Sequence, residues 1–255
     1  MSIHITFPNT LATDVDLASL PWETLWAMSH SDLSSTLVRV GKEAVKLGEL
    51  CAVDWIADDA AKLTIVNSTA AVHGIATRLK SGQVFVQGNA GQRAAVDMTG
   101  GHLIVQGDVG DDLAGASPGK TAGMRGGEIH VFGNAGQRAG ARLRRGILAI
   151  TGSVAEDCGC DALAGTIIVL GRKGARAGVG MKRASLIVFS PEGLDELRFI
   201  AGATSLPTWL RVYFRSLAAK GFTVPQIWNE GPFQRFTGDR TGLGKAEIWV
   251  LAGKT

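Results

Sequence analysis

The stretch GQVFVQGNAGQRAAVDMTG, residues 82–100, joins a strand-like run to a glycine-rich segment. Its heptapeptide GNAGQRA, residues 88–94, occurs again at residues 133–139. Self-similarity of this kind is the signature of repeat architectures. The chain aligns on this unit with starts at Ala61, Gly82, Gly101, Gly127, Gly146, Gly165 and Ala184. From Gly82 on the starts lie 19 residues apart, except where a 7-residue insertion falls within GASPGKTAGMRGG, residues 115–127.

Each unit opens with a short run in which apolar and mixed positions alternate, as in a strand with one buried face. The third position of the run is occupied by Leu63, Val84, Leu103, Ile129, Leu148, Ile167 and Leu186. The fifth is occupied by Ile65, Val86, Val105, Val131, Ile150, Val169 and Val188. A third apolar column follows later in the unit, at Leu79, Met98, Met124, Leu143, Ala162 and Met181.

A unit of 19 residues cannot bury these columns by itself, whereas stacked units bury each column against its copies. The pattern therefore predicts an all-β solenoid over residues 61–190, with parallel strands and a rise of about 4.8 Å per coil. We expect Val86, Val105 and Val131 to lie in one file. The starting Gly of each run, and the Gly or Asn after the run, should provide corners with positive φ.

Residues 1–60 and 191–255 show no repeat and contain all six Trp. Because an open solenoid end exposes unpaired strand edges, we expect these segments to be an N-terminal and a C-terminal cap. No apolar run approaches the roughly 18 residues of a membrane span, and no basic residue precedes Arg39. These features predict a cytoplasmic protein without membrane contact.

The net charge of +3 is unevenly distributed. Residues 62–190 carry 15 basic and 8 acidic groups, whereas residues 1–61 carry 3 and 9. One column, Arg93, Asp112, Arg138, Asp157 and Arg176, alternates in sign, so neighbouring coils should pair across it in a structural charge ladder. The column beside the methionines contains no acid, and with its flanks it gives a basic stripe: Lys80, Lys120, Arg125, Arg144, Arg145, Lys182 and Arg183.

Such a stripe predicts binding of a flexible polyanion. Aromatic residues are few in the coils, so stacking on nucleic-acid bases is not expected. Cys158 and Cys160 fall in columns that hold Ala or Val in other coils, which favours packing over metal or redox chemistry. The five His show no metal-ligand spacing, and we expect His102 and His130 to be surface residues. The sequence thus predicts neither catalytic nor metal-binding residues in this chain.

The repeat G-x-x-x-x-x-G-x-x-G, the insertion PGKTAGMRGG (118–127) and the tail FQRFTGDRTGLGKAEIWV (233–250) together resemble the C subunit of formylmethanofuran dehydrogenase. They are most similar to its counterpart in the bacterial formyltransferase/hydrolase complex. The resemblance covers essentially the whole chain. It implies a right-handed parallel β-helix without catalytic residues, acting as a structural component of a hetero-oligomeric enzyme complex. The C-terminal cap, 191–255, would include a tail that contacts a partner.

The resemblance also implies partners and a pathway. An amidohydrolase-like metal subunit and a formyltransferase subunit would move a formyl group between a furan-type carrier and tetrahydromethanopterin, and release formate during formaldehyde oxidation. A methanofuran or methylofuran carrier bears glutamates, so the basic stripe could hold its tail. The alternatives are the corresponding chain of the archaeal dehydrogenase and a glutamate synthase-like β-helix scaffold. A left-handed acyltransferase β-helix would need hexapeptide spacing, which a 19-residue period fits poorly.

Overall fold

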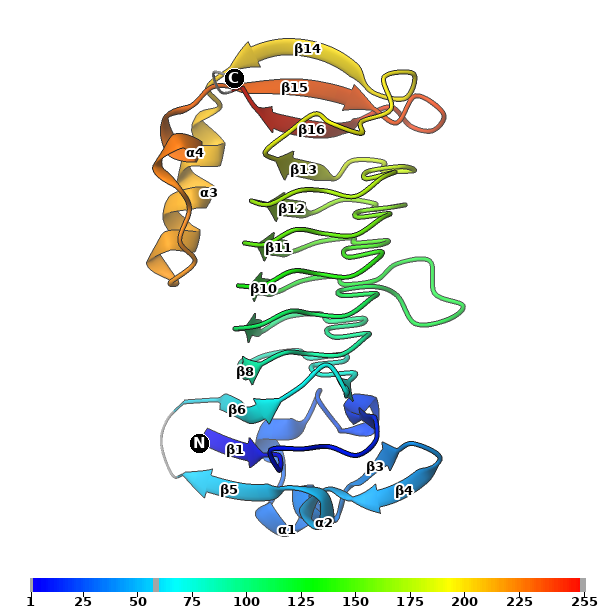
Figure 1. Ribbon diagram of the computed structural model, residues 1–255, viewed down its shortest axis with the longest axis vertical. Coiled ribbons are helices and arrows are strands. Elements are labelled where there is room, and N and C mark those ends of the chain that lie inside the picture. The colour runs from blue at the N-terminus through cyan, green and yellow to red at the C-terminus, as the bar shows by residue number, and fades with distance from the viewer. Residues whose placement is uncertain (1, 57–59, 253–255) are drawn as a thin grey trace.

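The computed structural model describes residues 2–56 and 60–252, which fold mainly into β-sheet with few helices. The strands are stacked one above another along the long axis of the molecule (Figure 1). This β-rich architecture agrees with the all-β prediction. The expected caps, 1–60 and 191–255, include residues 1, 57–59 and 253–255, which lie outside the described residues.

Twelve described strands form the main sheet. Their spatial order is β14 (Ile200–Ser205), β15 (Phe233–Gly238), β16 (Ala246–Leu251), β13 (Ser185–Val188), β12 (Thr166–Val169), β11 (Ile147–Ile150), β10 (Glu128–Val131), β9 (His102–Val105), β8 (Gln83–Gly88), β6 (Lys62–Ser68), β1 (Ser2–Thr6) and β5 (Ala52–Ile56). From β1 to β16 neighbouring strands are parallel, and the outer strands β5, β15 and β14 pair antiparallel.

A smaller sheet contains β4 (Glu43–Lys46), β3 (Leu37–Val40), β2 (Val15–Asp16) and β7 (Val72–His73). The described helices are η1 (Leu17–Ser19), η2 (Leu25–Ala27), α1 (His30–Ser35), α2 (Leu47–Leu50), α3 (Thr208–Ala219) and α4 (Gln226–Glu230). Within residues 2–56 and 60–252 no helix is both long enough and apolar enough to cross a bilayer.

Successive coils lie in the register that the repeat predicts. Val86 pairs with Val105, and Val105 pairs with Val131, so the expected file is confirmed. The side chains of all three apolar columns are fully or almost fully buried. Each coil therefore places the same apolar positions over those of the coil before it, which is how short units obtain a common core.

The corners stack as well. Ala90 bridges to Val109 and Val109 bridges to Ala135, so the duplicated heptapeptide occupies one corner, two coils apart. The starting glycines have positive φ, for example 93° at Gly127, where an added Cβ would lie 2.7 Å from the carbonyl oxygen of Gly101. A side chain at this position would collide with the neighbouring coil, which explains the glycine at these starts.

The asparagines of the heptapeptide act differently from the prediction. Neither Asn89 nor Asn134 has positive φ. Instead, the Oδ1 atom of Asn89 accepts a 2.8 Å hydrogen bond from the backbone N–H of Asp108, and Asn134 Oδ1 accepts one of 2.8 Å from Ser153. These bonds satisfy a backbone donor of the next coil, as a local Asx interaction would within one chain segment. These two asparagines lie in the corner, but the expectation that they have positive φ is wrong.

Both terminal segments contribute a strand to the stack. In β1, Ile3 and Ile5 pair with Leu63 and Ile65 and extend the two apolar columns at one end. In β16, Ile248 and Val250 pair with Leu186 and Val188 and extend them at the other. The buried columns therefore continue beyond the predicted repeat at both ends.

Helices α3 and α4 fold back beside the stack instead of lying across its end (Figure 1). Leu210, Phe214 and Leu217 of α3, with Trp228 of α4, are buried in a second apolar cluster. On the sheet side this cluster contains Ala149, Ile168 and Ile187, which sit between the two columns that face the main core. Strands β11–β13 are consequently buried on both faces.

Replacing a column residue should destabilise the whole stack. Leu103→Ala removes a fully buried side chain between Val84 and Ile129, and we expect the free energy of unfolding to fall by about 2–5 kcal/mol. Leu37→Ala, at a residue that is 55% exposed, should change it by less than about 0.5 kcal/mol. Urea denaturation monitored by circular dichroism measures both, and equal losses would contradict the stacked core.

The helical cover provides a second test on a single helix. Phe214→Ala empties a buried site against Trp228 and Phe233 and should cost about 3–5 kcal/mol. Val212→Ala, two residues away at a position that is 60% exposed, should have almost no effect. Amide hydrogen exchange of α3 would report the difference, and similar protection in both variants would show that α3 is not docked through Phe214.

Candidate functional site

The basic residues near the third apolar column point outward because their neighbours point inward. Met124, Leu143 and Met181 are fully buried, so the residues directly after them face solvent. Their backbones are fixed by bonds between coils: Arg144 N–H donates to the Met124 carbonyl at 2.9 Å. Basic side chains on successive coils are therefore held about one strand spacing, 4.8 Å, apart.

Five of the seven predicted basic residues line one cavity of about 750 Å³. These are Arg125, Arg144, Arg145, Lys182 and Arg183, and the remaining lining residues are Leu163, Ala164 and Gly165. All five basic residues are exposed, and none has an ion-pair partner within the part of the chain that the structure describes. We call this surface the basic groove. Its five uncompensated positive charges attract an anion.

Lys120 lies beside the groove, on the insertion that loops out of the stack (Figure 1). It lines a second cavity of about 470 Å³ that shares Arg125 and Arg144 with the groove. However, its Nζ atom lies 2.7 Å from an oxygen of Asp97, which is only 2% exposed. Burial raises the pKa of Asp97, but hydrogen bonds from Lys120 and Ser117 outweigh this and lower it. Lys120 therefore anchors the insertion, and its charge is compensated.

Lys80 lines neither cavity. Its Nζ atom lies 2.8 Å from an oxygen of Glu23, and this hydrogen bond lowers the pKa of the Glu23 carboxyl. The basic column itself contains no acid, but Glu23 and Asp97 reach it from outside. Their partners Lys80 and Lys120 are the two members of the predicted stripe that do not line the groove.

The residues of the predicted charge ladder form separate pairs. Arg138 binds Asp112 through two hydrogen bonds of 2.7 and 2.8 Å, and Arg176 binds Asp157 through two of 2.7 and 2.6 Å. Arg93 binds Asp16 of the N-terminal segment at 2.7 Å. Each arginine is thus occupied by a carboxylate and is not available to an external anion.

The two thiols of the Cys-Gly-Cys motif are unsuited to nucleophilic chemistry. Cys158 is fully buried, and this burial raises the pKa of its thiol to about 12. Burial also raises the pKa of Cys160, which is half-buried, to about 11. Since the thiolate is the reactive form, both residues are inert at neutral pH.

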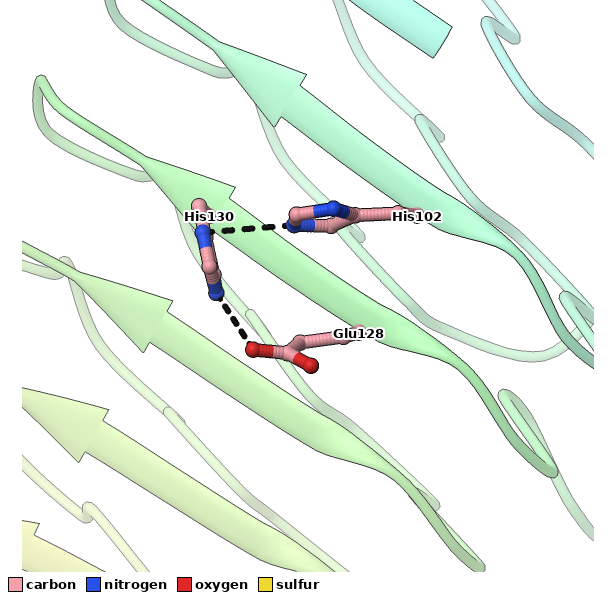
Figure 2. A group of neighbouring side chains, drawn as sticks. All are labelled: His102, Glu128 and His130. Carbon is pink, nitrogen blue, oxygen red and sulfur yellow. Dashed lines mark hydrogen bonds and ion pairs between the residues drawn. The ribbon is translucent and has the colours of Figure 1, made fainter. Parts of the chain in front are cut away.

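One cluster was missed from the sequence: His102, Glu128 and His130 come together on the sheet (Figure 2). His102 Nε2 lies 3.2 Å from His130 Nδ1, and His130 Nε2 lies 2.7 Å from Glu128 Oε1. His130 is fully buried, which corrects the expectation of a surface residue. The reason is that the chain after α3 folds back and places Phe222 against its ring, with centroids 5.3 Å apart.

The environment of this cluster fixes its charge state. Burial, together with the neighbouring His130, lowers the pKa of His102 to about 4, so its imidazole is neutral at pH 7. Burial raises the pKa of Glu128, but hydrogen bonds from His130 and Lys220 outweigh it and lower the pKa to about 2. Glu128 is therefore a carboxylate. The coil register could have revealed the group, because His102 and Glu128 share one column.

Comparison with solved structures gives a match that covers almost the whole chain. No family model and no curated protein matches this chain. Among solved structures, it matches a chain of the formyltransferase/hydrolase complex FhcABCD from Methylorubrum extorquens, which was solved in complex with methylofuran. The TM-score is 0.78 at 26% sequence identity, over 98% of this chain and 100% of that chain.

The match extends from the N-terminal strand through the coils to the C-terminal segment, because almost nothing in either chain is left uncovered. The resemblance found in the repeat, the insertion and the tail is therefore confirmed: the chain is a full-length structural relative of a chain of the formyltransferase/hydrolase complex.

Proposed function

We propose that this chain is the non-catalytic structural component of a formyltransferase/hydrolase complex, in the position that the C subunit has in the family. The full-length match to a chain of such a multi-subunit complex supports this role over a glutamate synthase-like domain or a chain of the archaeal dehydrogenase. Its partners would be the amidohydrolase-like metal subunit and the formyltransferase subunit. The complex would exchange formyl between a furan-type carrier and tetrahydromethanopterin and release formate.

The proposed architecture is a right-handed parallel β-helix over residues 61–190, between an N-terminal segment (1–60) and a C-terminal segment (191–255). The parallel pairing of β6 to β13 in a constant register supports it. The antiparallel strands β5, β15 and β14 then close the two ends.

We further propose that the basic groove holds the glutamate tail of a methylofuran-type carrier. The observation that carries this proposal is the convergence of five unpaired basic side chains on one cavity. Arginine guanidinium groups bind carboxylates in a bidentate manner. An extended tail advances by about 3.3–3.6 Å per residue, so that it can present carboxylates to the basic residues of several coils spaced at about 4.8 Å.

The ion pairs of the other basic residues support one course for the proposed tail. Lys80, on the N-terminal side, is compensated by Glu23 and would not attract it. The path therefore begins beside the insertion, at Arg125, and runs toward Lys182 and Arg183. Such a path holds the carrier by its tail and leaves the formyl-bearing end free to reach the active sites of partner subunits.

Reversing the charge of the groove should weaken binding of an oligoglutamate probe. In the variant with Arg125→Glu, Arg144→Glu and Lys182→Glu, three attractions become repulsions, and we expect the Kd for a fluorescently labelled oligoglutamate to rise about 10-fold or more at low salt. Fluorescence anisotropy on the full chain measures this. Added salt should weaken the wild-type interaction, because these exposed charges are screened.

A matched control carries Arg39→Glu, Lys42→Glu and Lys46→Glu, which change the net charge equally at exposed positions outside the groove. This control should retain wild-type affinity. Equal affinities of the groove variant and the wild type at low salt would refute tail binding. Equal weakening in both variants would also contradict it, because oligoglutamate binding would then depend on the net charge of the chain and not on the groove.

Membership of the complex is tested separately. Affinity purification of this chain from its native host should recover an amidohydrolase-like subunit and a formyltransferase subunit, identified by mass spectrometry. The groove variant should recover them equally well, because the proposed role of the groove is in carrier binding. Purification of the chain without either partner would contradict the proposed complex.

A further inference from the structure

The cluster of His102, Glu128 and His130 lies on one rigid face of the main sheet. Glu128 of β10 is the direct partner of His102 of β9, and His130 follows Glu128 by two residues. Side chains two apart on a strand share a face, as do direct partners on adjacent strands. The backbone ladder therefore fixes the origin of all three side chains (Figure 2).

The potential ligand atoms are already close to the separations that a metal ion requires. One donor atom from each of His102, Glu128 and His130 can be chosen so that all lie within 4.8 Å of one another. Zn²⁺ binds imidazole nitrogen and carboxylate oxygen at about 2.0–2.2 Å in tetrahedral geometry, so that two of its ligands lie about 3.3–3.6 Å apart. Side-chain rotations that move the donor atoms by about 1 Å would bring them around one ion, and bonds to the ion would replace the hydrogen bonds within the cluster.

Packing alone does not account for these residues. His130 occupies a column in which β11, β12 and β13 carry Ala149, Ile168 and Ile187, all of them buried and apolar. Both nitrogens of the buried His130 ring need a polar partner, which His102 and Glu128 provide, whereas an aliphatic side chain would fill this position without either partner.

The surroundings provide cover and access. Phe222 lies against His130 and also against Phe132, with ring centroids 5.3 and 5.8 Å away, which shields the cluster from solvent. A cavity of about 400 Å³, lined in part by Lys220 and Gly221, adjoins the cluster through Lys220, whose ammonium group is paired with Glu128. The three candidate ligands do not line this cavity, so a water that completes four-fold coordination would reach the ion past Lys220.

We propose that His102, Glu128 and His130 form a binding site for a divalent transition-metal ion of the zinc class. Two imidazoles and one carboxylate, with a water as fourth ligand, are a ligand set that suits Zn²⁺. In the metal-free chain Lys220 supplies the positive charge beside Glu128, and on binding the ion replaces it. Since Lys220 is half-exposed, its ammonium group can move into solvent.

The test uses the full chain, free of affinity tags and stripped of metal with a chelator. Titration with Co²⁺ should give visible absorption bands that saturate at one ion per chain, and Zn²⁺ should abolish them by displacement. We expect His102→Gln to weaken binding about 100-fold or more, because loss of an outer-shell partner alone costs about 10–100-fold. His102 is half-buried, so this variant should keep its fold, which its thermal unfolding verifies.

Three further variants make the assignment specific. Lys220→Ala removes the competing cation and should tighten Zn²⁺ binding, whereas a lysine that only stabilises the fold would leave the affinity unchanged or lower. Cys160→Ala and His30→Gln, at other potential ligands, should bind as the wild type does. The proposal is overturned if the wild type shows no stoichiometric binding, if His102→Gln has no effect, if binding depends on Cys160, or if Lys220→Ala does not tighten it.

Discussion

The structure depends on the parallel register between neighbouring coils. No coil has a core of its own, because its inward side chains, such as Leu103 and Val105, are buried only by their counterparts above and below. The backbone bonds that hold this register also determine what happens on the outside. When a residue type recurs at one position of the repeat, its side chains form a column along the stack. The basic groove and the histidine cluster are both products of this geometry.

The repeated features could be predicted from the sequence because each of them recurs at the same position in several units. The buried columns, the glycine corners and the convergence of Arg125, Arg144 and Lys182 follow directly from the alignment of the units. The prediction was less complete for Lys80 and Lys120. Their carboxylate partners, Glu23 and Asp97, come from other positions in the chain and leave no trace in the column itself.

The features that occur once could not be derived in the same way. The strands SIHIT (2–6) and AEIWVL (246–251) have the alternation of the repeat but lack its glycine start, so their place in the stack was not recognised. The return of α3 and α4 along the sheet is likewise a tertiary effect, because their apolar residues do not reveal which surface they cover. This return buries His130, which the sequence alone places on an outward face.

The antiparallel strands at the two ends have a consequence for assembly. A purely parallel stack presents the same kind of edge at each end and could grow without limit, but the antiparallel strands β5 and β15 interrupt the pattern at a defined number of coils. The stack of coils therefore has a fixed length, and it advances by about 4.8 Å per coil. Two proteins bound at its opposite ends would be held at a distance that depends on the number of repeat units. Losing one unit would shorten this distance by one strand spacing.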